Sequence, residues 1–176
     1  MGNTILLNAD YSFLDTLTTK KAICLVVKGK AEVVKENVKE VYRNFENTFS
    51  INSPLVIRLI KFVRLVFKKQ VPLTKRNIFV RDRYSCQYCR RKVGFGSRGL
   101  TIDHIYPKAK GGKTEWENCV TSCHKCNTFK GSKTLKECGL TLNKKPVRPT
   151  IGEFIQIKAN VLGVDQIIKD LMRGIS

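Results

Sequence analysis

The stretch CQYCRRKVGFGSRGLTIDHIYPKAKGGKTEWENCVTSCHKCNTFKGSK, residues 86–133, decides the fold of this 176-residue chain. It contains two Cys-x-x-Cys pairs, Cys86 with Cys89 and Cys123 with Cys126. Two residues between cysteines let both sulfurs reach one tetrahedral ion from a tight turn, and two such turns complete a four-sulfur shell. That shell leaves no open position, so the pattern predicts a structural zinc ion rather than a catalytic one.

The residues between the two pairs predict a strand, a loop, a second strand and a helix. Leu100 to Ile105 largely alternates apolar and polar residues, as a strand does. Pro107 and the Gly111-Gly112 pair mark a loop, and the chain is expected to return as a strand over residues 116–120. A helix is expected from Cys123 to Lys130. A unit this small needs the zinc ion to fold.

The rest of the chain predicts a β-rich first half and short helices at the end. We expect strands at residues 4–8, 31–34 and 38–45, a helix from Thr18 or Thr19 to Lys28, and a helix over residues 74–83. Residues 56–69 favour a strand, although the spacing of their basic residues also fits one face of a helix. The predicted fold is α+β, with a supporting region at 1–72, a finger at 73–140, and a linker with C-terminal helices at 141–176.

The composition points to a polyanionic partner. Thirty-three Lys and Arg residues against 14 Asp and Glu give a net charge of +19. Nucleic acid is the leading partner, because each neutralised phosphate releases counterions. No apolar run is long enough to span a bilayer and no secretory leader is apparent, so we expect no membrane partner and a cytoplasmic location. Cytoplasmic cysteines rarely form disulfides, and Cys24, Cys119 and Cys138 are expected to be small buried side chains.

The runs LTIDHIYPKAKGG and WENCVTSCHKCNTFKG resemble the HNH endonucleases, the ββα-metal finger nucleases with Cys-x-x-Cys knuckles. The resemblance covers residues 86–133, and more loosely the helix before them. The order His104, Asn118, Asn127 corresponds to the HNN form of the motif. The resemblance implies metal-dependent hydrolysis of phosphodiester bonds in DNA.

The resemblance also implies a role for each motif residue. His104 would be the general base that takes a proton from water, a task that suits histidine near neutral pH. Asp103 and Asn127 would hold one catalytic Mg²⁺ or Mn²⁺ ion, which prefers oxygen ligands. Asn118 would orient the loop and the His104 region. One metal ion implies one strand cut per visit, so a double-strand cut would need a homodimer or two visits. Part of a lysine set would contact DNA phosphates: Lys108, Lys110, Lys125, Lys130 and Lys133.

The sequence is also compatible with other functions. A zinc finger that binds nucleic acid without cutting it would need the four cysteines and the basic residues but not Asp103 and His104. A nuclease that acts on RNA would carry the same motif. A structural role in a larger assembly, such as phage DNA packaging, is a third alternative.

Overall fold

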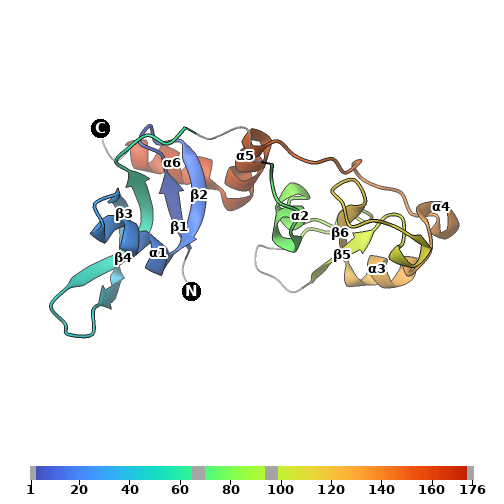
Figure 1. Cartoon of the computed structure of the whole chain (residues 1–176), viewed down its shortest axis with the longest axis horizontal. Coiled ribbons are helices and arrows are strands. Elements are labelled where there is room, and N and C mark those ends of the chain that lie inside the picture. The colour runs from blue at the N-terminus through green and yellow to red at the C-terminus, as the bar shows by residue number, and fades with distance from the viewer. Residues whose placement is uncertain (1–2, 65–69, 94–98, 174–176) are drawn as a thin grey trace. The chain divides into compact units, whose positions relative to one another are not determined.

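The computed structural model describes residues 3–64, 70–93 and 99–173. The chain divides into two compact units, each described here by itself (Figure 1). The N-terminal unit comprises Met1–Val66 and Gly163–Ser176, and the finger unit comprises Phe67–Leu162. The predicted α+β fold, with a β-rich first half and a ββα finger, is confirmed.

The N-terminal unit is built on a four-stranded mixed sheet in the order β2-β1-β4-β3. The first strand pairs antiparallel with β2 and parallel with β4, while β3 and β4 form an antiparallel hairpin. Its elements are β1 (Asn3–Leu7), β2 (Phe13–Thr18), α1 (Thr19–Val27), β3 (Ala31–Arg43), β4 (Ser50–Leu59) and α6 (Val164–Arg173).

The helix predicted after Thr18 is confirmed as α1. Thr18 is its N-cap, and the chain leaves the helix through Gly29, whose φ of 61° is one that glycine adopts without a steric penalty. Ala22 is fully buried against Ala31 and Ile57 of the sheet. Cys24 is exposed, so its predicted burial is wrong. Side chains two residues apart on a helix point in directions that differ by about 200°, so Cys24 faces away from the buried face on which Ala22 lies.

The strand predictions need three corrections. The two segments expected over 31–45 are one strand, β3, whose pairing with β4 shifts register between Asn37 and Val41. The strand expected over 56–69 begins earlier and ends at Leu59, and its last predicted residues, 65–69, lie outside the described part. The strand β2, which pairs with β1 at the edge of the sheet, was not predicted.

The finger unit contains the predicted strand-loop-strand-helix order. The hairpin pairs Leu100 with Cys123 and His104 with Cys119, so its second strand starts three residues later than expected. The elements are α2 (Lys75–Arg81), β5 (Leu100–His104), the 3-10 helix η1 (Lys108–Lys110), β6 (Cys119–Cys123), α3 (His124–Lys130), α4 (Leu135–Cys138) and α5 (Ile151–Leu162).

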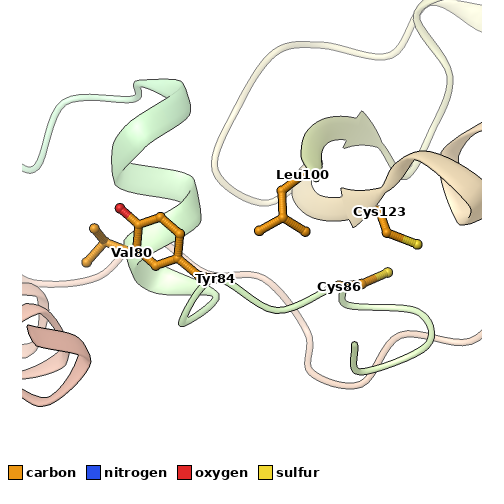
Figure 2. Close-up of a cluster of buried hydrophobic side chains, with 5 residues drawn as sticks. All are labelled: Val80, Tyr84, Cys86, Leu100 and Cys123. Carbon is orange, nitrogen blue, oxygen red and sulfur yellow. The ribbon is translucent and has the colours of Figure 1, made fainter. Parts of the chain in front are cut away.

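Two small apolar clusters form the core of the finger unit. Figure 2 shows the first, in which Val80, Tyr84 and Leu100 gather beside Cys86 and Cys123. The second surrounds Trp116, which is 2% exposed. Phe154 of α5 packs against both clusters, so the segment after the finger contributes to the same core.

None of the helices that the structure describes has the length and apolar character needed to span a lipid bilayer.

Candidate active site and metal centre

The four knuckle cysteines converge on one point. The sulfurs of Cys86, Cys89, Cys123 and Cys126 all lie within 4.8 Å of one another. Sulfurs bound to one tetrahedral zinc ion at ~2.3 Å are separated by ~3.8 Å, and the Cys89 and Cys123 sulfurs are 3.8 Å apart. Burial raises the pKa of the Cys123 thiol, but hydrogen bonds from the backbone and the other thiols outweigh it and lower that pKa to about 7. The cluster is therefore compatible with a structural zinc ion.

A buried ion pair joins the helix before the first knuckle to the hairpin. The Arg81 guanidinium donates to both carboxylate oxygens of Asp82, at 2.8 and 3.0 Å, and both side chains are 7% exposed. Arg81 also donates to the carbonyls of Trp116 and Cys119, each at 2.7 Å. The second Asp82 oxygen accepts the backbone N–H of Thr121 at 2.7 Å. The Arg81–Asp82 pair thus fixes α2 against β6.

Asn118 holds the loop between the two strands. Its side-chain oxygen accepts the N–H of Tyr106 at 2.7 Å, and its amide group donates to the carbonyls of Tyr106 and Lys113 at 3.1 and 2.7 Å. A Cβ atom on Gly112 would lie 1.9 Å from the Tyr106 carbonyl oxygen, so only glycine fits there. These contacts occupy the Asn118 side chain with the loop backbone, which agrees with a positioning role.

A small open hollow of about 220 Å³ lies where β5, the loop and the end of α3 meet. The last two residues of β5, Asp103 and His104, both line it, together with Lys108 and Lys130. Asp103 is 7% exposed and His104 is half-buried. The hollow therefore combines a carboxylate, an imidazole and two ammonium groups, which are the kinds of group that bind phosphate and transfer protons.

The Asp103 carboxylate is held from two sides. The Tyr88 hydroxyl, inside the first knuckle, donates to it. The Lys130 ammonium lies 3.1 and 3.2 Å from its two oxygens and donates to the His104 carbonyl at 2.6 Å. Burial raises the pKa of Tyr88, and the hydrogen bond to Asp103 raises it further, so the phenol stays protonated and able to donate.

The surroundings of His104 favour the neutral form of its imidazole. Burial lowers its pKa below the usual 6.5, and the positive charges of Lys108 and Lys130 lower it further against the opposing effect of Asp103. Its Nε2 atom lies 3.0 Å from the Thr114 hydroxyl oxygen. A neutral imidazole has a free ring nitrogen that can accept a proton.

The other predicted site residues lie in different settings. Asn127 is a half-buried residue of α3 and is not among the residues that line the hollow. Lys110 pairs with Glu137 at 2.7 Å, while Lys125 and Lys133 are exposed. Lys130 is 1% exposed, so it is a buried partner of Asp103 rather than the surface lysine that the sequence analysis expected.

The donor types suit a hard divalent cation. A carboxylate offers about four lone-pair directions, so Asp103 retains room for an ion beside Tyr88 and Lys130. The Asn127 amide oxygen is a second hard donor. Among the residues that the structure describes, only the four knuckle cysteines form a group of three or more Cys, His, Asp or Glu side chains close enough to share a metal ion. A catalytic ion here would therefore rest on few protein ligands.

Sequence reasoning missed Tyr88 and Thr114 as partners of Asp103 and His104. Tyr88 stands between the cysteines of a knuckle, where its side chain could as well have faced solvent. Thr114 lies in a loop with no periodic pattern. The Arg-Asp pair at the end of α2 was visible in the sequence, but its burial depends on β6, which lies 38 residues further along.

Two known protein families match parts of this chain. Residues 86–133 match the model of the HNH endonuclease family, and residues 4–67 match that of the HNH endonuclease-associated N-terminal domain. No match was found among curated proteins or among solved structures. The finger of this chain, with its four-cysteine cluster and its Asp103-His104 hollow, is therefore an HNH endonuclease domain that follows an HNH endonuclease-associated N-terminal domain.

Proposed function

We propose that the protein is a metal-dependent endonuclease that hydrolyses phosphodiester bonds in DNA, with His104 as the general base. The observation that carries the proposal is the hollow in which Asp103, His104, Lys108 and Lys130 meet. An HNH endonuclease domain implies nuclease activity in general.

His104 would take the proton through Nδ1 in the tautomer whose Nε2–H donates to the Thr114 hydroxyl oxygen, because Nδ1 is then the free acceptor. The water oxygen then forms a bond to phosphorus while the bond to the departing sugar oxygen breaks, and that oxygen is protonated from solvent. A divalent ion held by Asp103 and Asn127 would stabilise the negative charge that develops at phosphorus and at the departing oxygen.

The exposed lysines around the hollow would bind the DNA backbone. Lys108 lines the hollow itself and is exposed. Lys125 and Lys133 lie at the start of α3 and just after it. Lys110 shares its charge with Glu137, so we expect it to contribute less. Phosphate contacts of this kind position a nuclease without selecting a sequence.

The test is nicking of supercoiled plasmid by the zinc-loaded protein. Nicked circles should accumulate with Mg²⁺ or Mn²⁺ and not when either ion is omitted. A protein that binds plasmid but leaves it intact under both ions would be a binding module instead. Single-stranded RNA offered at the same concentration should be cut more slowly than duplex DNA, and the reverse order would reassign the substrate.

A further inference from the structure

The hollow carries more positive than negative charge before any metal ion enters. Its lining contains one acidic residue, Asp103, and two lysines, Lys108 and Lys130. Mg²⁺ sheds its water reluctantly and is usually bound through one or two carboxylates together with substrate phosphates. The net positive charge of this hollow therefore disfavours binding of a divalent cation to the protein without DNA.

The Lys130 charge is a fixed part of the site. Its side chain is fully buried, and its ammonium group contacts both the Asp103 carboxylate and the His104 carbonyl. If Lys130 swung out, the Asp103 carboxylate and the His104 carbonyl would each lose a hydrogen bond, which is unfavourable. Lys108 is different, because it is exposed and can turn toward solvent.

The donors on Asp103 also reduce the number of bonds it can make to an ion. Lys130 contacts both carboxylate oxygens, and Tyr88 donates to one of them. These contacts take three of about four lone-pair directions. One inner bond to a cation remains, and the adjacent ammonium charge opposes it.

We propose that Lys130 is a positioning residue that couples metal binding to substrate binding. This inference rests on the proposed function. Lys130 offsets the charge of Asp103, so that a divalent cation binds firmly only when a DNA phosphate supplies the missing negative charge. Cation and scissile phosphate thus enter the hollow together, and the free protein binds the ion weakly.

Binding of Mn²⁺ can be followed by the electron paramagnetic resonance signal of the free ion, without any cleavage. The protein is the zinc-loaded His104→Ala variant, which keeps Asp103 and Asn127 and should leave DNA intact. We expect one Mn²⁺ per protein to bind at least about tenfold more tightly with duplex DNA than without it. Adding Asp103→Asn to the same variant corrects for ions held by DNA alone and should abolish the extra site. Equal affinity with and without DNA would overturn the proposal.

A matched pair of lysine variants tests the role of the buried charge. Lys130→Met should strengthen Mn²⁺ binding to the DNA-free protein by at least about tenfold, whereas Lys108→Met, the same change on an exposed side chain, should have a smaller effect. Equal effects would refute a special role for Lys130. Zinc content and circular dichroism check that each variant folds. If Lys130→Met does not fold, the comparison of Mn²⁺ affinity with and without DNA still tests whether metal binding depends on DNA.

Plasmid nicking by the wild-type protein separates this inference from the proposed function. If the wild type nicks DNA but binds Mn²⁺ equally well without it, only the role of Lys130 is wrong. If the wild type does not nick DNA under either ion, the proposed function itself is wrong.

Discussion

The buried pair of Arg81 and Asp82 should be the strongest single polar support of the finger. In Asp82→Ala the guanidinium keeps its two carbonyl partners but loses its counter-charge, and the N–H of Thr121 loses its acceptor. Removing one partner of a buried pair costs roughly 3–5 kcal/mol. Both side chains are 7% exposed, so solvent screens this loss little. We expect the free energy of unfolding of the finger unit to fall by about that amount.

The assay is urea unfolding of the zinc-loaded protein, followed by tryptophan fluorescence. Trp116 is the single tryptophan of the chain and is buried in the finger unit, so the signal reports on that unit. With a slope of about 1–3 kcal/mol per molar urea, the midpoint should move by roughly 1–5 M. Lys110→Met breaks an exposed ion pair in the same unit and should leave the midpoint close to that of the wild type. A loss below about 1 kcal/mol in Asp82→Ala would refute the reasoning.

Three further predictions concern the loop, the base and the knuckles. Asn118→Ala removes three hydrogen bonds from the loop and should lower the free energy of unfolding by about 1–3 kcal/mol in the same assay. Its nicking activity should fall by a larger fraction than its free energy of unfolding does. Because the pKa of His104 is lowered, nicking should rise with pH to a plateau whose midpoint lies below 6.5. Lys108→Ala removes a charge that lowers this pKa and should move the midpoint to higher pH, while Lys110→Ala should not; an unmoved profile in Lys108→Ala would remove that explanation. A strong zinc chelator should unfold the finger and shift the tryptophan emission, and an unchanged spectrum and activity would mean that the four-cysteine assignment is wrong.

The sequence predicts the parts of this fold that a local rule controls. The knuckle spacing restricts the cysteines to one ion, and the Asp103-His104 strand, the loop glycines and the following helix all appear where expected. Thr18 and Thr74 are the N-cap residues of α1 and α2, and the Thr74 side chain accepts the backbone N–H of Asn77.

The sequence does not predict features that depend on distant partners. The strand β2 forms by pairing with the edge of β1. The residues of β2 alone do not indicate that this partner is available. A lysine at the end of a short helix suggests a surface charge, yet Lys130 is buried because Asp103 and the His104 carbonyl lie within its reach. Tyr88 and Thr114 contact Asp103 and His104 because of the folded positions of the knuckle and the loop, which the sequence does not indicate.

The role of His104 is the central claim, and the chain offers a matched control for it. His124 is the only other histidine, is exposed, and lies outside the hollow. The decisive measurement is the rate constant of plasmid nicking with excess zinc-loaded enzyme and saturating Mg²⁺ or Mn²⁺, compared between the wild type, His104→Ala and His124→Ala. We predict that His104→Ala is slower by at least about 10²-fold and that His124→Ala stays close to the wild type. Equal rates for the wild type and His104→Ala would contradict the account.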